Sequence, residues 1–288
     1  MEKLGTSMLT IIKNINIQPD AAPPPPPAYL KTVTADTLHK YDLIKRGQCR
    51  YIIAGEVPCN CADGYVFKRI EHKPMALPCP QCSGLNKRLN RLQRAQLPNE
   101  AYDSTLDTYI YDSPSQEAMI NDIISSEYPH IPRSLFMYGK SGNGKSTISY
   151  IIAKHLSLAG YRVKYIHHYD MFQKEKKSWS TNTSVIDSIV DNIDVLLLDE
   201  FGGLGGRGNY SEWFTNTTVE LVGILYEKYR SGQLCVILTS NLTPKQIFNR
   251  LLDKNDMALS RLQNIFGNPL HMQGPDRRAK GNQVSKWI

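Results

Sequence analysis

Short apolar runs alternate with amphipathic stretches along the chain from about residue 105 onward. Four apolar runs have the length expected of buried strands: 134–138, 162–166, 195–198 and 234–239. Five stretches have the spacing of amphipathic helices: 115–126, 146–158, 185–190, 217–230 and 258–265. Strands that alternate with helices predict an α/β fold in which a mostly parallel central sheet is covered on both faces.

The chain ahead of this region has a different pattern. Consecutive prolines at 23–27 favour an extended polyproline II segment, which is either a tether or a docking ligand for an aromatic groove. Residues 49–97 contain paired cysteines and end in a helical pattern at 86–96. We therefore expect three parts along the chain: a flexible N-terminal segment with a polyproline linker (1–48), a cysteine module with a basic helix (49–98) and the α/β domain (99–288).

A glycine-rich loop connects the first strand of the α/β domain to its helix. Its residues satisfy the phosphate-loop pattern G-x-x-x-x-G-K-[ST]: Gly139, Lys140, Ser141, Gly142, Asn143, Gly144, Lys145 and Ser146. The strand before the loop and the helix after it supply the context that the motif needs. In such a loop, backbone N–H groups cradle a triphosphate. We expect Lys145 to reach the β- and γ-phosphates, Ser146 to bind Mg²⁺, and Thr147 to lie near the α-phosphate of ATP.

Polar residues follow two later strands, at the sheet edge where ligands of α/β folds bind. Asp199 and Glu200 end the apolar run 195–198. Asp199 is expected to hold Mg²⁺, and Glu200 to polarise the attacking water. Asn241 follows the run 234–239, where it either orients that water or simply opens a turn. His167 and His168 follow the second strand, and for them either a place near the site or a structural role is open.

The cysteines occur as two closely spaced pairs. Cys59 and Cys61 are separated by one residue, and Cys79 and Cys82 by two, with seventeen residues between the pairs. Four thiolates in this arrangement are typical of a tetrahedral structural Zn²⁺ site. Zinc would supply much of the folding free energy of a module with few apolar residues. Replacement of one ligand by Cys49 or His72, and free or redox-active cysteines, are the alternatives.

Charge and composition add two expectations. The net charge is +7, and the densest basic stretch, 83–98, contains Lys87, Arg88, Arg91 and Arg94 without an acid. This stretch is either a solvated helix face or a contact for nucleic-acid phosphates or an acidic partner. No apolar run reaches the roughly 18 residues of a membrane-spanning helix, and no signal-peptide pattern is present. We expect a soluble, cytoplasmic protein without a membrane partner.

The ordered motifs between about residues 100 and 279 resemble one family. Residues 196–202, 226–230, 237–243 and 260–262 look like the AAA+ ATPase domain of bacterial and phage replicative-helicase loaders of the DnaC/DnaI type and of related IstB-like transposition ATPases. The resemblance implies an AAA+ P-loop fold that binds ATP, assembles side by side, and engages single-stranded DNA and a hexameric replicative DNA helicase. It also implies that residues 139–147 are Walker A, that Asp199 and Glu200 are Walker B, and that Asn241 is sensor 1.

The resemblance suggests further roles near the C-terminal end of the sequence. Arg261 matches an arginine finger that would act on the ATP of a neighbouring subunit, a role that requires an oligomer; a surface arginine is the alternative. Residues 270–278 resemble the last strand of the family and its Gly-x-Asp-x-Arg signature, which leaves open whether Arg277 or Arg278 faces nucleotide. Only 47 residues follow Asn241, so we expect no full helical lid, as in the loaders.

These expectations favour an ATP-dependent helicase loader, with ATP, Mg²⁺ and Zn²⁺ as cofactors. An IstB/TnsC-like transposition ATPase that selects target DNA is the first alternative. A small-molecule phosphotransferase would not need the set of Glu200, Asn241 and Arg261. A nucleic-acid-binding scaffold that does not hydrolyse ATP is the remaining alternative.

Overall fold

The computed structural model describes residues 65–70, 73–78, 90–106, 109–178, 184–203 and 210–277. The first two segments form an antiparallel hairpin of β1 (Tyr65–Ile70) and β2 (Lys73–Pro78). The polyproline run and the zinc ligands expected from the sequence lie outside the described residues, namely Cys59, Cys61, Cys79 and Cys82. The zinc module therefore stays a prediction.

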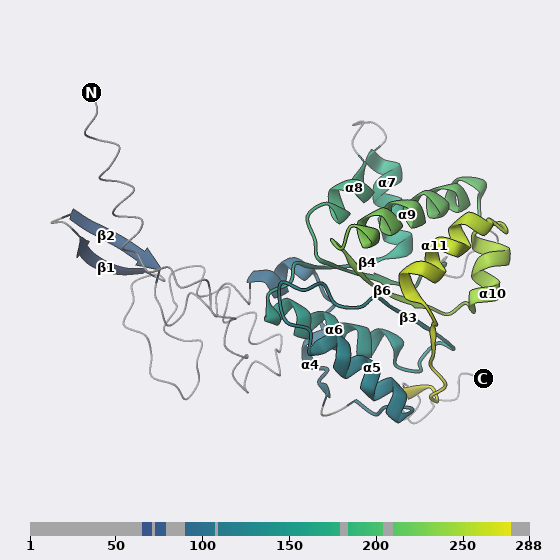
Figure 1. Cartoon of the computed structure of the whole chain (residues 1–288), viewed down its shortest axis with the longest axis horizontal. Coiled ribbons are helices and arrows are strands. Elements are labelled where there is room, and N and C mark those ends of the chain that lie inside the picture. Colours follow the sequence, from purple (N-terminus) through teal and green to yellow (C-terminus); the bar gives the residue numbers. More distant parts are fainter. Residues whose placement is uncertain are drawn as a thin grey trace, which may run out of the picture.

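A five-stranded sheet forms the centre of the α/β region (Figure 1). Its strands are β3 (Leu135–Tyr138), β4 (Val163–His167), β5 (Val195–Asp199), β6 (Cys235–Ser240) and β7 (Leu270–His271). They lie in the order β4-β5-β6-β3-β7, and every neighbouring pair is parallel. This arrangement confirms the predicted parallel central sheet.

Helices connect the strands. Their bounds are α4 (Glu100–Asp103), α5 (Pro114–Ile124), α6 (Lys145–Ala159), α7 (His168–Ser178), α8 (Val185–Val190), α9 (Glu212–Arg230), α10 (Pro244–Gln246) and α11 (Asp256–Phe266). Residues 90–95 are also helical, and a short π-helical segment, Ile247–Leu251, follows α10. Helix α7 was not expected from the sequence, and α9 begins five residues earlier than the predicted 217.

Side-chain caps set where several helices begin. The Ser113 hydroxyl accepts the N–H of Gln116 at the start of α5. Ser211 accepts the N–H of Phe214 at 3.2 Å and thereby starts α9. Asn255 caps α11 in the same way at 2.9 Å. Each cap satisfies a backbone donor that the first turn of a helix leaves without an internal partner.

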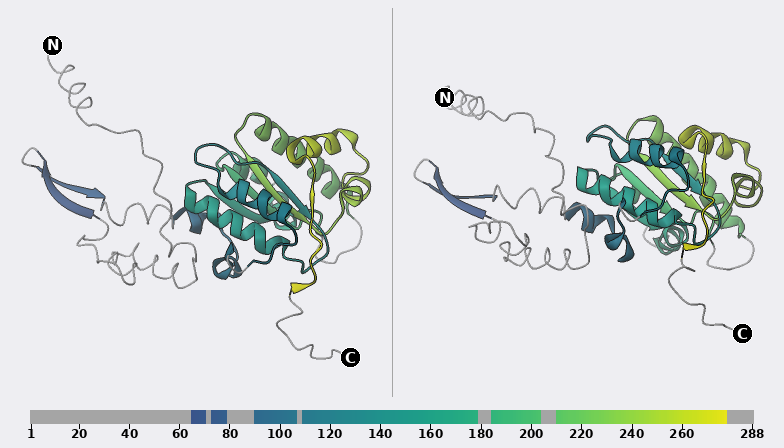
Figure 2. Two further views of the ribbon diagram at one scale, coloured as in Figure 1. Left: turned by 60° about the horizontal axis from the view of Figure 1, so that its bottom comes forward. Right: turned by 90° about the horizontal axis from the view of Figure 1, so that it is seen from below.

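The sheet separates two hydrophobic cores. Alternate residues of one strand face opposite sides, so Leu197 belongs to one core while Leu196 and Leu198 belong to the other. Helices α5 and α6 cover the first face, and α7, α8, α9 and α11 cover the second (Figures 1 and 2). Leu92 and Ala95 of the helix 90–95 are fully buried in the first core, so the end of the predicted basic helix packs on the α/β region.

The described chain after β6 packs on the α/β region itself. Helix α11 lies against α9, and the chain then returns to the sheet as β7 beside β3. Among the described residues, no helix is both long enough and apolar enough to cross a membrane.

Candidate nucleotide site

The phosphate loop joins β3 to α6 at the carboxyl ends of the strands. Gly142 and Gly144 have φ angles of +82° and +92°, a region that residues with a side chain rarely adopt. A Cβ atom at Gly142 would also lie 2.1 Å from a carboxylate oxygen of Asp276. Gly144 is the N-cap of α6, so the positive end of a fifteen-residue helix begins directly in the loop.

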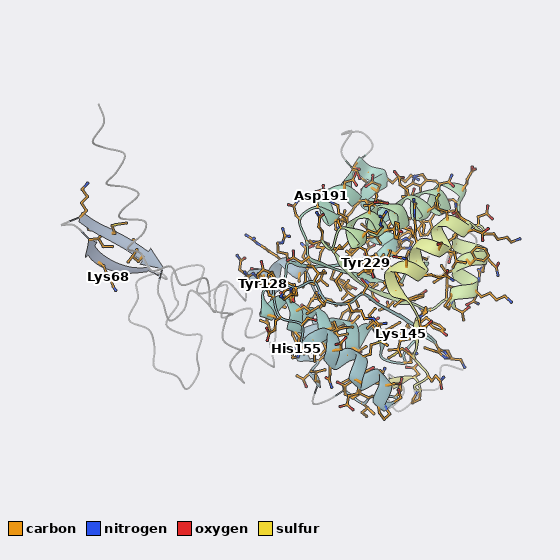
Figure 3. All side chains as sticks on the ribbon, in the orientation of Figure 1. Lys68, Tyr128, Lys145, His155, Asp191 and Tyr229 are labelled. Atoms are coloured by element: carbon orange, nitrogen blue, oxygen red, sulfur yellow. The ribbon has the colours of Figure 1, made fainter. Side chains whose placement is uncertain are left out.

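Lys145 is held inside this loop. Its ammonium group donates to the carbonyl oxygens of Gly139 at 2.8 Å and Lys140 at 2.7 Å, and to Oδ1 of Asn143 at 3.1 Å. The amide of Asn143 in turn donates to the carbonyl of Met272 at 2.6 Å, next to β7. The residue is only 6% exposed and lies at the start of α6, where Figure 3 labels it. The loop is therefore folded around its own lysine.

A cavity of about 250 Å³ brings most of the predicted site residues together. Its lining consists of Ser141, Gly142, Asn143, Gly144, Lys145, Ser146, Thr147, Glu200, Thr239, Ser240, Asn241 and Arg277. The phosphate loop, one acidic residue of Walker B and the expected sensor thus share one opening. Gly139 and Lys140 do not line the cavity. Their carbonyl oxygens accept hydrogen bonds from the Lys145 ammonium group.

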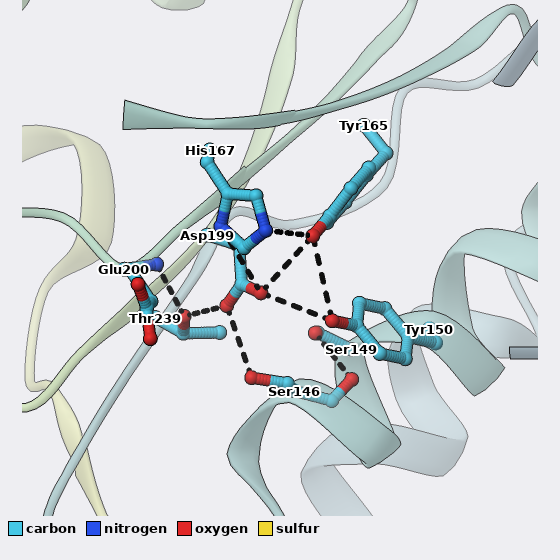
Figure 4. Close-up of polar contacts among 8 residues, drawn as sticks. All are labelled: Ser146, Ser149, Tyr150, Tyr165, His167, Asp199, Glu200 and Thr239. Carbon is cyan, nitrogen blue, oxygen red and sulfur yellow. Dashed lines mark hydrogen bonds and ion pairs between the residues drawn. The ribbon is translucent and has the colours of Figure 1, made fainter. Parts of the chain in front are cut away.

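Asp199 lies at the back of this cavity and is 1% exposed. Its Oδ1 accepts a hydrogen bond from the Ser146 hydroxyl at 3.1 Å and another from the Thr239 hydroxyl. Its Oδ2 accepts a hydrogen bond from the Tyr150 hydroxyl at 3.1 Å. Figure 4 shows these groups converging from α6 and β6 on the Asp199 carboxylate at the end of β5.

Burial dominates the electrostatics around Asp199. It raises the pKa of the Tyr150 hydroxyl far above its ordinary value, and the charge of Asp199 raises this pKa further. Burial likewise raises the pKa of Tyr165, the neighbour of Tyr150. Both hydroxyls consequently stay protonated at any physiological pH, and they present protons toward a buried carboxylate.

Glu200 occupies a strained backbone position beside the cavity. Its φ angle is +54°, a left-handed conformation that is costly for a residue with a side chain. Thr239 secures this turn twice, because its hydroxyl accepts the Glu200 N–H at 3.1 Å and its carbonyl accepts the Phe201 N–H at 2.8 Å. The Glu200 side chain is exposed toward the opening, while its backbone is fixed to β6.

His168 secures the same turn from the other side. Its Nδ1 accepts the N–H of Gly202 at 3.1 Å, and its ring packs against Phe201 with centroids 4.6 Å apart. Complete burial lowers the pKa of His168 to about 3, so the ring is neutral at pH 7. Of the two roles left open for this histidine, the structure supports the structural one.

Arg277 lines the cavity from the C-terminal side. Its backbone N–H donates to the carbonyl of Gly142 at 2.9 Å. Its guanidinium donates to the Ile110 carbonyl at 2.6 Å and to Asp112 at 3.1 Å, and it lies 4.5 Å from the centre of the Tyr109 ring. Arg278 lies outside the described residues. Of the two arginines in the Gly-x-Asp-x-Arg signature, the structure describes only Arg277, and this residue reaches the cavity.

Arg261 lies away from this cavity, on α11. Its guanidinium stands 5.7 Å from the centre of the Tyr226 ring of α9. It also lies against Gly223, where an added Cβ atom would come within 3.1 Å of the guanidinium. The residue is partly exposed, and it is not among the described residues that line the cavity of its own chain.

The residues at the cavity fit a magnesium ion. Ser146 supplies a hydroxyl oxygen and Asp199 a carboxylate oxygen, and these two atoms are 3.1 Å apart. Mg²⁺ prefers hard oxygen ligands and is usually held by one or two carboxylates together with substrate phosphates. The donor chemistry therefore suits Mg²⁺ bound together with a nucleotide. In the part of the chain that the structure describes, no group of three or more His, Cys, Asp or Glu side chains forms a metal site.

Several residues of the site were not expected from the sequence, namely Tyr150, Tyr165 and Thr239. Two of them carry a signal that could have been read. Tyr150 follows Ser146 by four residues, so both lie on one face of α6. Tyr165 precedes His167 by two residues on β4, so both point to one side of the sheet. Tyr150 and Tyr165 both reach Asp199 because β4 pairs with β5 and places His167 opposite Asp199. This pairing cannot be read from the spacing of residues along the sequence.

Comparison with known families decides the assignment of this α/β region. Residues 85–267, which are 183 of the 288, match the family described as IstB-like ATP binding protein. The chain belongs to this family. The match includes the phosphate loop, the two acidic residues and Asn241, and it confirms the resemblance to IstB-like ATPases.

Similar proteins include replication factors. The chromosomal replication initiator protein DnaA of Oenococcus oeni is 27% identical over 147 residues, which are 50% of this chain but only 31% of that protein. The crystal structure of DnaI covers 64% of this chain and 95% of its own, with 16% identity and a TM-score of 0.50. The crystal structure of the DnaC helicase loader covers 61% of this chain and 100% of its own, with 20% identity and a TM-score of 0.48. The similarity to DnaI establishes the shared fold.

Proposed function

We propose that the chain hydrolyses ATP to ADP and phosphate in this cavity. The observation that carries the proposal is the convergence of the phosphate loop, Glu200 and Asn241 on one opening, with Asp199 directly behind Ser146. A phosphate-binding loop alone would serve many enzymes. An exposed carboxylate beside it provides a group that can accept a proton from water, which favours hydrolysis over simple binding.

Each residue has a distinct role in this proposal. The loop N–H groups and Lys145 bind the phosphates, and Ser146 with Asp199 holds Mg²⁺, which neutralises charge on the β- and γ-phosphates when bound. Glu200 polarises the attacking water, and Asn241 orients that water or contacts the γ-phosphate. Thr239 fixes the Asp199 carboxylate relative to the Glu200 backbone, because its hydroxyl donates to Oδ1 of Asp199 and accepts the Glu200 N–H.

Arg261 serves a neighbouring subunit in this proposal. Its guanidinium is partly exposed on α11 and lies outside the cavity of its own chain. An arginine that completes the active site of a neighbour stabilises the charge that develops on the transferred phosphoryl group, an effect of about 10³ to 10⁵ in rate. We therefore propose that the active form is an oligomer whose sites are shared between subunits.

The biological role that we propose is loading of a hexameric replicative helicase onto single-stranded DNA. Support comes from the shared fold with DnaI and from the replication initiator among the relatives. The zinc module predicted at 49–98 would contact the helicase, and the ATPase domain predicted at 99–288 would assemble on DNA. Target selection in transposition is the second candidate, and membership of the IstB-like family favours it.

The ATPase proposal is tested with Lys145→Ala. The change removes the cation of the phosphate loop, so ATP binding and hydrolysis should both be lost. A matched control is Lys140→Ala, because the Lys140 side chain is exposed and only its backbone carbonyl takes part in the loop. Turnover in Lys145→Ala at the rate of the unaltered chain would refute the proposed site.

The partner is tested by affinity capture with defined proteins. A purified hexameric replicative helicase and a purified transposase are each offered to the chain, with ATP and with ADP. The loader proposal predicts retention of the helicase, and retention that depends on the nucleotide. Retention of the transposase alone would assign the chain to target selection instead.

A further inference from the structure

The two carboxylate oxygens of Asp199 face different surroundings. Oδ1 is bonded to the hydroxyls of Ser146 and Thr239, which line the nucleotide cavity. Oδ2 is turned toward the interior, where it lies 3.1 Å from the Tyr150 hydroxyl and 3.5 Å from the Tyr165 hydroxyl (Figure 4). Oδ1, on the phosphate-loop side, and Oδ2, on the interior side, therefore share no hydrogen-bond partner.

The interior side is a connected set of polar groups, which we call the rear network: Tyr150, Tyr165 and His167. The Tyr165 hydroxyl lies 2.7 Å from Nε2 of His167 and 3.5 Å from the Tyr150 hydroxyl. Nδ1 of His167 is buried, has no hydrogen-bond partner among the described residues, and lies 3.9 Å from Oδ2 of Asp199. Two elements, α6 and β4, thus contribute to one contact surface for a single oxygen atom of Asp199 on β5.

A rear contact of this kind limits how the carboxylate can turn. A partial rotation about the last side-chain bond of Asp199 would turn the carboxylate plane away from Ser146, and it would break the hydrogen bond from Tyr150. Asp199 is 1% exposed and Tyr150 is 6% exposed, so water cannot readily replace the lost donor. Mg²⁺ requires nearly ideal octahedral geometry, and groups that orient its ligands are worth about 10- to 100-fold in metal affinity.

We propose that Tyr150, supported by Tyr165 and His167, is a positioning residue that holds Oδ2 of Asp199 so that Oδ1 alone faces Mg²⁺ beside Ser146. The inference rests on the proposed nucleotide site but concerns residues that the site itself does not require. None of the three residues of the rear network lines the nucleotide cavity among the described residues. Their effect on the nucleotide therefore passes through Asp199.

The test compares Tyr150→Phe with Tyr161→Phe. Tyr161 is an equally suitable target in the same core, since it is fully buried and its hydroxyl donates to the His130 carbonyl at 2.6 Å, away from Asp199. Both changes remove one buried hydroxyl and keep the ring. Binding of a fluorescent, non-hydrolysable ATP analogue is measured in EDTA and across a Mg²⁺ titration, so that no readout depends on turnover.

The inference predicts that Tyr150→Phe needs about tenfold more Mg²⁺ for half-maximal enhancement of binding, while its affinity in EDTA stays within about twofold of the unaltered chain. Tyr161→Phe should match the unaltered chain in both measurements. Tyr165→Phe, which removes the link to His167, should shift the Mg²⁺ requirement in the same direction by less. If Tyr150→Phe does not fold, the Tyr165→Phe titration decides the question.

Two results would overturn the inference while leaving the proposed function intact. One is an unchanged Mg²⁺ requirement in both tyrosine variants of the rear network. The other is an equal loss of affinity with and without Mg²⁺, which would mean that Tyr150 merely supports the loop. An unaltered chain that binds the analogue without any effect of Mg²⁺ would instead contradict the metal site of the proposed function, and the inference with it.

Discussion

Thr239→Val removes a single hydroxyl at the point where the two acidic residues of the site are joined. This hydroxyl donates to Oδ1 of Asp199 and accepts the backbone N–H of Glu200 at 3.1 Å. The side chain is 1% exposed, and valine occupies nearly the same space as threonine, so no cavity forms. The change therefore isolates two hydrogen bonds.

The expected loss of stability follows from these two contacts. A buried donor that loses its partner costs about 1 to 3 kcal/mol, and here the N–H of Glu200 becomes such a donor. Asp199 retains the hydroxyls of Ser146 and Tyr150, so its own loss is smaller. We expect the free energy of unfolding to fall by about 2 kcal/mol.

Thr239→Val should reduce ATP turnover more strongly than it reduces stability. Glu200 sits at φ +54°, a conformation that costs about 1 to 3 kcal/mol and persists only where its surroundings impose it. Without the Thr239 hydroxyl, one of the bonds that impose it is gone, and the carboxylate is displaced from the attacking water. A displacement of about 1 Å costs on the order of 100-fold in rate. ATP affinity measured in EDTA should change little, because the phosphate loop is untouched.

The assay combines denaturant unfolding with steady-state ATP hydrolysis. Thr218→Val is the matched control: Thr218 is fully buried on α9, and its hydroxyl only donates to the Phe214 carbonyl at 2.7 Å. It should leave turnover unchanged. Full turnover in Thr239→Val, or losses of turnover and ATP affinity by the same factor, would show that the hydroxyl does not position Glu200.

Three further predictions follow from the site and from the sequence. Subunits carrying Arg261→Ala and subunits carrying Glu200→Gln should each be inactive, but their mixture should regain ATP turnover, because an intact finger then meets an intact Glu200; no recovery in confirmed mixed oligomers would contradict a shared site. Elemental analysis should find one zinc per chain that is lost in Cys79→Ser with Cys82→Ser, with the thermal transition of the ATPase domain retained; zinc-free protein would refute the module. The folded-state pKa of His168, about 3, lies below its ordinary value of 6.5, so the unfolded chain binds an extra proton and stability falls as pH drops through 6.5. Between pH 7 and pH 5, urea unfolding should show that the unaltered chain loses about 2 kcal/mol more unfolding free energy than His168→Asn does. Equal losses in the two proteins would contradict this prediction.

The strands could be predicted because buried parallel strands are continuous apolar runs. The run 195–198 corresponds to Val195–Asp199, and the run 234–239 to Cys235–Ser240. Helix α7 could not be predicted in this way. Its buried residues are only His168, Met171 and Phe172, and apart from the partly buried Tyr169 the rest of the helix is polar. Its position depends on β4 and α8, which pack against it.

The site divides in a similar way. The phosphate loop, Asp199 and Glu200 could be predicted because their chemistry fixes residue types at fixed spacing. The rear network could not, because it requires the register that places His167 beside Asp199 and the helix that brings Tyr150 to Asp199 and Tyr165. Sequence spacing gives the two faces on which these residues lie, but only packing shows that the faces meet.

The central claim, that this cavity hydrolyses ATP with Glu200 as the group that activates water, is tested most directly by Glu200→Gln. The change keeps the shape of the side chain and removes only its capacity to accept a proton, while Ser146, Asp199 and the loop are untouched. We predict that Mg²⁺-dependent ATP binding stays within about threefold of the unaltered chain and that phosphate release in a single turnover falls by at least about 100-fold. Phosphate release at the unaltered rate, measured on nucleotide shown to be bound, would contradict the account.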